Sequence, residues 1–207
     1  MNKKKKCKKG YKEYIIRLSK KMSSTNANNA IMDGKNIDTS LFSYSQPKSH
    51  ASGGKVVNLY NKLSKESLTL ACPLMLTWGA QEGQNDKKEP NGKYTMSLQF
   101  PNTDFPNPDA SAFLESLKEL EASIQATALA NSKEWFGKVI TSAEVIAEKF
   151  NPMLRYPKME RGSAEFNYEK PPTLSVKLPC WKNIWQMEVF DEDGNPLFLK
   201  KDNAVKS

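Results

Sequence analysis

The chain has 207 residues and a formal net charge of +8, but the excess charge is confined to its beginning. Residues 1–22 hold ten Lys or Arg and one acid, whereas the rest of the chain holds 21 basic and 22 acidic residues. No run of roughly 20 apolar residues is present to span a bilayer, and no apolar stretch follows the Lys-rich start as a secretory signal requires. We therefore expect a soluble, intracellular protein without a membrane partner.

The first fifty residues predict a basic and polar arm without a core of its own. Lysine dominates up to Lys21, and Ser, Asn, Lys and Gly dominate from Met22 to Gly54 without apolar periodicity. A Lys-rich run neutralises phosphates and is also a weak nuclear-localisation motif. Alternatively, translation begins at Met22 and the basic run is an artefact. The expected organisation is a disordered arm over 1–50, a folded domain over 51–200 and a short basic tail over 201–207.

Strands are expected at the start of the folded domain. The segment KVVNLY at 55–60 predicts a first strand. Pro73 interrupts the apolar run at 68–78, which predicts an edge strand, a bulge or two short strands. A polar stretch at 79–92 predicts a turn or loop, and 93–100 alternates apolar and polar residues as a half-buried strand does. One face of that strand would hold Tyr94, Met96, Leu98 and Phe100.

Two helices are expected in the middle of the domain. The first covers about 109–131, where Asp109 is placed to cap it and apolar residues recur every three or four positions. The second covers about 142–150 and begins with a capping-box pattern from Thr141 to Glu144.

Strands return after the helices and complete the predicted fold. TLSVKL at 173–178 alternates, IWQMEVF at 184–190 predicts another strand, and PLFL at 196–199 predicts a last one after a DEDGN hairpin turn. The order of strands, helices and strands differs from the regular alternation of a doubly wound sheet. We therefore predict a mostly β fold of the α+β class, with an antiparallel barrel and a helical insertion over about 109–150.

The residues that enzymes and metal sites need are sparse. His50 is the only histidine and lies in a Ser/Lys/Gly-rich stretch, so no rigidly held imidazole supports a catalytic triad. The three cysteines are widely separated and lack the spacing of a zinc site. The acidic segment Asp191–Asp193 is explained more simply as a hairpin turn with Gly194 than as a Mg²⁺ site. We therefore expect no enzyme, no metal and no cofactor.

A binding function has better support between residues 150 and 187. Six basic and three acidic residues occur there with five interleaved aromatic residues, whereas residues 104–124 hold five acids and one lysine. Basic side chains along a nucleic-acid backbone, with aromatic rings for unpaired bases, are typical of single-strand binders. Alternatively, aromatic residues on strands belong to the core. This interleaving makes contact candidates of Trp181, Lys182 and Trp185.

Five blocks of sequence occur in an order that resembles one protein family. They are PLMLTWGAQE (73–82), KYTMSLQFP (93–101), NSKEWFGK (131–138), NPMLRYPK (151–158) and PPTLSVKLP (171–179). Together they resemble the single-stranded DNA-binding proteins of nucleo-cytoplasmic large DNA viruses of algae and protists. That family is distantly similar to the single-stranded DNA-binding protein of short-tailed coliphages. The resemblance spans roughly residues 42–199 and implies an OB-like barrel that binds single-stranded DNA with little sequence preference.

The same resemblance implies which residues contact the strand. The aromatic and basic positions of the family blocks correspond here to Trp78, Tyr94, Trp135, Phe136, Lys138, Arg155, Tyr156 and Lys158. We favour Arg155, Tyr156, Lys158 and Lys177 as strand contacts. Trp135, Phe136 and Lys138 are also candidates, although Trp135 and Phe136 alternatively form a packing corner between the two helices.

Partners and location follow from the resemblance as expectations. The role implied is viral DNA replication, recombination or repair, with replication proteins as partners, in the host nucleus or a cytoplasmic viral factory. The family continues past the DEDGN turn with further β structure, so we expect a barrel that is incomplete at the C-terminus. Its open edge favours a homo-oligomer. The alternative function is a virion structural or genome-packaging protein, whose Lys-rich arm lies on duplex DNA.

Overall fold

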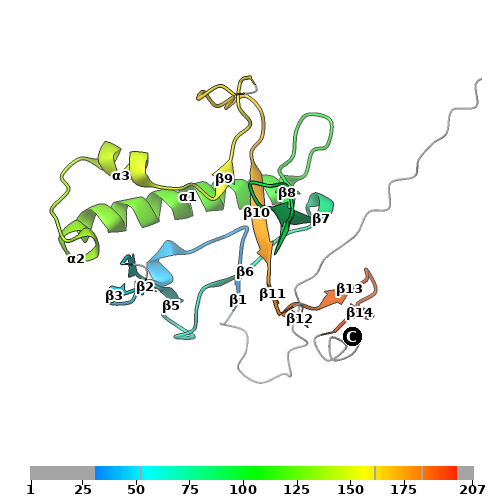
Figure 1. The fold of residues 1–207 in the computed structure, drawn as a ribbon, viewed down its shortest axis with the longest axis horizontal. Coiled ribbons are helices and arrows are strands. Elements are labelled where there is room, and N and C mark those ends of the chain that lie inside the picture. Colours follow the sequence, from blue (N-terminus) through cyan, green and yellow to red (C-terminus); the bar gives the residue numbers. More distant parts are fainter. Residues whose placement is uncertain (1–30, 52, 161, 183, 200–207) are drawn as a thin grey trace, which may run out of the picture.

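A four-stranded sheet and one long helix form the centre of the fold (Figure 1). This computed structural model describes residues 31–51, 53–160, 162–182 and 184–199. The predicted tail at 201–207 and the part of the predicted arm up to residue 30 therefore lie outside the described residues. Five two-stranded sheets complete the described fold. The chain is mostly β with a few helices, as the predicted α+β class requires.

The four strands of the central sheet are antiparallel and follow the order β7-β8-β10-β9. They are β7 (Leu76–Gln84), β8 (Pro90–Gln99), β10 (Thr173–Leu178) and β9 (Leu154–Arg155). The half-buried strand predicted at 93–100 is confirmed, because Met96, Leu98 and Phe100 are buried and the residues between them are not. The strand predicted at 173–178 is confirmed as β10.

The helix α1 (Pro108–Ala130) packs against one face of this sheet. Its apolar residues recur at helical spacing, which places Phe113, Leu117 and Leu120 together in the core. The predicted cap at Asp109 is wrong. The Asn107 side chain caps the helix instead by accepting a hydrogen bond from the Ala110 N–H at 3.0 Å, because Pro108 opens the first turn and moves the start toward the N-terminus.

Residues before position 51 belong to the fold, so the expected boundary there is wrong. The strand β1 (Ile31–Asp33) pairs in parallel with β6 (Thr69–Ala71), and both Ile37 and Phe42 are buried in the core. The sequence pattern did not indicate that this segment is folded, because its apolar residues are few among polar ones and their partners are distant in the chain. Buried contacts with α1 and the sheet supply the order that local periodicity does not indicate.

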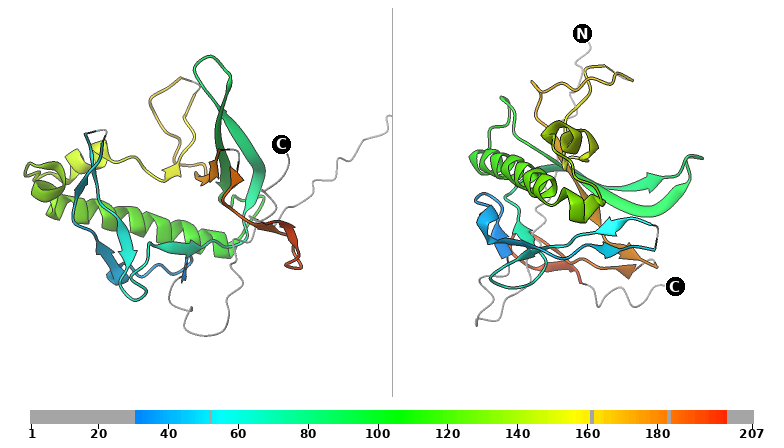
Figure 2. Two further views of the ribbon diagram at one scale, coloured as in Figure 1. Left: turned by 60° about the horizontal axis from the view of Figure 1, so that its bottom comes forward. Right: turned by 90° about the vertical axis from the view of Figure 1, so that its left-hand side faces the viewer.

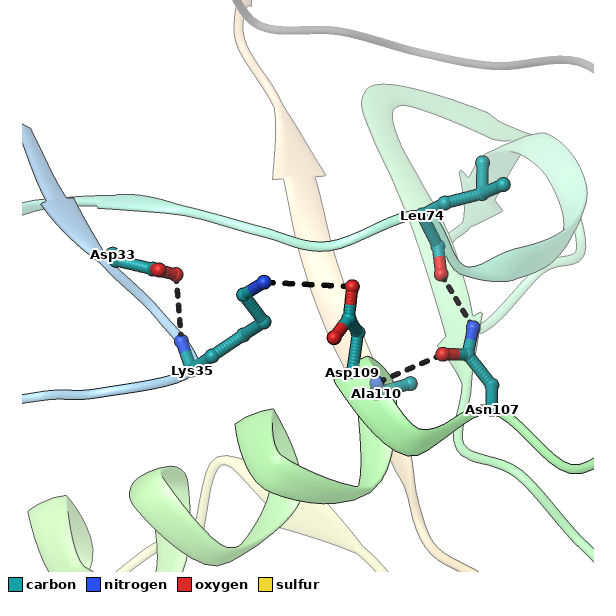
Figure 3. A network of polar contacts seen from close by, with 6 residues as sticks. All are labelled: Asp33, Lys35, Leu74, Asn107, Asp109 and Ala110. Atoms are coloured by element: carbon teal, nitrogen blue, oxygen red, sulfur yellow. Dashed lines mark hydrogen bonds and ion pairs between the residues drawn. The ribbon is translucent and has the colours of Figure 1, made fainter.

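Polar contacts fix the start of α1 to two other segments (Figure 3). Lys35 reaches from just after β1 to the Asp109 carboxylate at 3.4 Å. Asn107 donates a hydrogen bond to the Leu74 carbonyl at 2.9 Å while its oxygen caps the helix. Because Leu74 lies shortly before β7, this contact also fixes the entry of the chain into the central sheet.

The remaining elements are short. Between β1 and β6 lie η1 (Thr39–Leu41), β2 (Phe42–Tyr44), β3 (Lys48–Ser49), β4 (Lys55–Val56) and β5 (Leu59–Asn61). After α1 come α2 (Ser132–Phe136), α3 (Ala143–Lys149), β11 (Cys180–Trp181), β12 (Ile184–Trp185), β13 (Val189–Phe190) and β14 (Pro196–Phe198). Among these, β2 pairs with β5, β3 with β4, β11 with β12 and β13 with β14.

Several boundaries differ from the prediction for local reasons. The expected loop at 79–92 is mostly strand, since β7 extends to Gln84 and β8 begins at Pro90. The strand predicted at 55–60 is split into β4 and β5, and the one predicted at 184–190 is split into β12 and β13. The second helix is capped by Ser142 and not by Thr141, because the Ser142 hydroxyl accepts from the Glu144 N–H at 3.2 Å. Pro73 lies between β6 and β7, and β7 is an edge strand, which was one of the three predicted alternatives.

The described strands do not close into a barrel. They form one four-stranded sheet and separate two-stranded pairs, so a continuous ring of hydrogen-bonded strands is missing from the described residues. None of the described helices is long and apolar enough to cross a membrane.

Candidate nucleic-acid interface

The central sheet has one face toward α1 and one face away from it. Successive side chains of a strand point to opposite faces, so the buried residues Met96, Leu98 and Leu154 mark the face toward the helix. The residues between them form the other face, which we call the open face. In the part of the sheet where β8 pairs with β10, it consists of Leu76, Trp78, Gln81, Thr95, Ser97, Gln99, Arg155, Thr173, Ser175 and Lys177.

The strand register arranges the open face in three rows. Direct partners across the strands put Arg155, Thr173, Gln99 and Leu76 in the first row. Lys177, Thr95 and Gln81 form the third row. Ser175 and Ser97 lie between these rows. None of the ten side chains is buried, and none is a carboxylate. Four residues of extended chain separate the first row from the third along β10, a span of about 13 Å.

Trp78 lies in the middle row of the open face, on the edge strand β7, because β7 has a bulge there. Thr77 pairs with Leu98 and Ala80 pairs with Met96, so Trp78 and Gly79 together lie opposite Ser97. Gly79 has a φ of +90°, a backbone conformation that residues with a side chain rarely adopt. The Trp78 side chain is 65% exposed, which is high for the largest apolar side chain on a sheet. The bulge therefore presents an indole ring at the β7 edge of the open face, beside the polar face of β8.

The β11–β12 hairpin extends this face beyond Lys177. Cys180 and Trp185 are cross-strand partners, and the Trp185 ring packs on Tyr94 with centroids 4.6 Å apart. Tyr94 belongs to the strand face that turns toward α1, so Trp185 is on that side of the hairpin. The next cross-strand pair of the hairpin, Trp181 and Ile184, has its side chains on the opposite side, away from Tyr94. Trp181 is 70% exposed. It lies four residues after Lys177, and this even spacing in extended chain places both side chains on the same face.

The charges of the sheet and of α1 are separated. Arg155 and Lys177 are both exposed on the open face. Glu115 and Glu119 are exposed on α1, which packs on the opposite face of the sheet. This arrangement provides a positive surface for a polyanion on the side away from the helix, and it agrees with the opposite charge of the two sequence segments.

Tyr156 and Lys158 continue from the edge strand into a separate aromatic group. The Tyr156 ring contacts Tyr168 with centroids 4.8 Å apart, and Tyr168 contacts Phe166 at 6.3 Å. Lys158 is exposed and forms an isolated bridge with Phe166. Tyr156 is half-buried against the core, while Tyr168 is 71% exposed. Of this pair, Tyr168 has the more accessible ring, although the sequence pattern had not favoured it as a contact.

Trp135, Phe136 and Lys138 lie at the other end of α1. Trp135 packs against Tyr44 of β2, with ring centroids 5.4 Å apart and planes inclined by 49°. The half-buried Trp135 ring is thus packed against the β2–β5 pair. Phe136 is 50% exposed, and Lys138 is exposed. The helix α2 ends there because Gly137 takes a left-handed φ of +75°.

The candidate residues are therefore distributed over more than one surface. The open face brings together Arg155 and Lys177, and the adjoining hairpin adds Trp181 and the exposed Lys182. It does not include Trp185, which packs on Tyr94, or the three residues at α2. Trp78 matches a family position but was not among the favoured contacts. The sequence feature that could have identified Trp78 was the Trp-Gly pair inside an apolar strand, since a glycine within a strand often marks a bulge.

No family model, curated protein or solved structure matches this chain.

The described residues contain no cluster of three or more His, Cys, Asp or Glu side chains placed to hold a metal ion. The Asp191 carboxylate accepts hydrogen bonds from the backbone N–H groups of Asp193 at 3.1 Å and Asn195 at 2.7 Å. The Asn195 side-chain amide also donates a hydrogen bond to this carboxylate. The side-chain bond is the largest cause of the lowered pKa of Asp191, and the backbone bonds add to it. Gly194 has a φ of +81°, so the predicted hairpin turn is confirmed.

Proposed function

We propose that this protein binds single-stranded DNA through the open face of its central sheet. The observation that carries the proposal is the position of Trp78, which is 65% exposed on a sheet face that holds Arg155 and Lys177 and has no carboxylate. An exposed indole on the same face as two cations is the combination that a strand of unpaired bases and phosphates requires.

Each part of the open face has a chemical role in this proposal. The Trp78 ring stacks on a base, and stacking contributes about 1–3 kcal/mol per base. Arg155 and Lys177 lie in the rows on either side of the Trp78 row, about 13 Å apart along the strand direction, and contact different phosphates of the same strand. Trp181 offers a second ring further along. The Ser, Thr and Gln side chains provide hydrogen bonds without a fixed base pattern, so we expect little sequence preference.

The viral role and the OB-like topology belong to the same proposal. They rest on the five sequence blocks given above, four of which overlap the strands of the central sheet. On this basis we propose a function in viral DNA replication, recombination or repair, with replication proteins as partners. The protein would act in the host nucleus or in a cytoplasmic viral factory, by binding and without catalysis.

The two edge strands of the central sheet do not favour a homo-oligomer formed through the sheet edge. The edge strand β7 has two irregularities, between Thr77 and Ala80 and between Glu82 and Gln84. The other edge strand, β9, has only two residues. Bulges and short strands are ways in which proteins avoid pairing at an edge. If the chain self-associates, we expect another surface to be responsible.

The experiment is a titration of the full chain and of a chain that begins at Met22, each with oligo-dT and with matched duplex. A single-strand binder is expected to bind oligo-dT in both forms and to prefer it over duplex. Binding by the full chain alone, with equal affinity for duplex, would contradict the proposal. That outcome would favour the virion or genome-packaging function, in which the Lys-rich segment supplies the affinity.

A further inference from the structure

A second candidate surface lies at the far end of α1 from the central sheet. Figure 1 and the left view of Figure 2 both place α2 and the β3–β4 pair at one end of the long axis and the four-stranded sheet toward the other. The helix α1 connects the two ends, and its 23 residues correspond to about 34 Å. A side chain at α2 therefore cannot contribute to the open face.

This end of the molecule contains a pocket of about 420 Å³ with aromatic walls. It is lined by Gly53, Lys55, Val57, Trp135 and Phe136. The Trp135 ring packs against Tyr44, whereas the Phe136 side chain is half exposed. The pocket thus offers one fixed aromatic ring and one accessible ring to a ligand.

The charge of this region is complementary to a phosphate backbone. The Lys55 ammonium donates a hydrogen bond to the Glu134 carbonyl at 2.8 Å, which holds it beside α2. Residues 48–57 and 132–138 together contain four lysines and one carboxylate, that of Glu134. Lys138 is exposed just beyond the left-handed turn at Gly137. Aromatic rings beside lysines fit a base and its phosphate.

We propose that the pocket at α2 is a second strand-binding site, so that one chain holds a single strand at two separated places. This inference rests on the proposed function of the open face. A strand long enough to reach both sites binds the second one intramolecularly, and such linkage raises affinity by about 10²–10⁴-fold without new contacts. A strand too short to span α1 occupies each site separately and gains nothing from the linkage.

The test uses the full chain with oligo-dT of graded length, from about 6 to about 40 nucleotides. Calorimetry gives the number of strands bound and their affinity. The variant is Lys55→Ala with Phe136→Ala, which leaves Trp135 and its packing intact. A matched control is Lys149→Ala with Leu197→Ala, since Lys149 is an exposed lysine on α3 and Leu197 is 62% exposed on β14.

The wild-type chain is expected to bind two short strands or one long strand. The double variant should bind one short strand and lose at least tenfold in affinity for the long one, while the control variant behaves as wild type. A double variant with wild-type stoichiometry and affinity at every length would overturn the second site alone, provided that Trp78→Ala still weakens binding. A wild-type chain that binds no oligonucleotide would overturn the proposed function and the second site together.

Discussion

The carboxylate of Glu121 accepts a hydrogen bond from the backbone N–H of Leu154 at 3.1 Å, and it also accepts one from the Met153 N–H. These bonds join the middle of α1 to the start of β9. Arg155 is the next residue of that strand, and it is one of the two cations of the open face. A side chain on the helical side of the sheet therefore fixes the position of a cation on the opposite side.

Replacement of Glu121 should destabilise the fold and loosen β9. In Glu121→Ala two backbone donors lose a charged acceptor, and hydrogen bonds to charged groups contribute about 1.5–3 kcal/mol. Glu121→Gln keeps an acceptor oxygen and should cost less. Urea unfolding measures the loss, and hydrogen exchange at the Leu154 amide reports whether β9 opens. Equal stability of the Ala variant and wild type would show that the contact contributes nothing.

Gly34 should not tolerate a side chain. A Cβ atom at this position would lie 2.7 Å from the Ala71 carbonyl oxygen and 2.7 Å from a ring carbon of Phe113, where neither backbone nor core can easily move. We expect Gly34→Ala to lower the free energy of unfolding by about 1–3 kcal/mol, as overpacking does. Gly54→Ala is the control, since a Cβ atom added there would meet nothing within 4 Å. Thermal unfolding of both variants compares them directly.

The two cations of the open face should each contribute to the salt dependence of DNA binding. Loss of one phosphate contact reduces the slope of log affinity against log salt by about 0.7 for a single strand. We expect this reduction for Lys177→Ala and for Arg155→Ala. Lys149→Ala, an exposed lysine on α3, should leave the slope unchanged. Fluorescence titrations with oligo-dT at several salt concentrations supply the slopes, and three identical slopes would argue against the open face.

The Tyr94 anchor of the β11–β12 hairpin should weaken only at alkaline pH. Its pKa is raised, first by a hydrogen bond to the Glu82 carboxylate and then by desolvation. Because the folded pKa lies above the unfolded value, the stabilisation is fully present below the unfolded pKa and is lost as pH rises through the folded pKa. In Glu82→Gln the pKa of Tyr94 should fall toward its ordinary value. An absorbance titration of tyrosinate in both proteins checks this, and coincident curves would contradict it.

The parts of the fold with strong local signals were predictable from the sequence. The alternation at 93–100 and 173–178 and the helical spacing after Asp109 identified β8, β10 and α1. These elements bury a regular set of side chains, so their pattern carries the information. The hairpin turn at Gly194 could also be predicted from the sequence, because few residues other than glycine adopt its backbone conformation.

Features that depend on distant contacts were not predictable. The strand β1 is ordered by parallel pairing with β6, far along the chain, and not by its own composition. The open face depends on the register of four strands, and the position of Trp78 depends on a bulge within that register. The family resemblance named contact residues without their positions in space, and the structure places Trp135, Phe136 and Lys138 at the opposite end of α1 from Arg155 and Lys177.

The most direct test of the central claim is the affinity of Trp78→Ala for oligo-dT, measured beside wild type and Trp78→Phe. Trp78 is 65% exposed, so the substitution should leave thermal unfolding nearly unchanged. We predict that the Ala variant loses about 1–3 kcal/mol of binding free energy, the value of one stacked base, and that the Phe variant retains much of it. Wild-type affinity in the Ala variant would contradict the claim that the open face binds the strand.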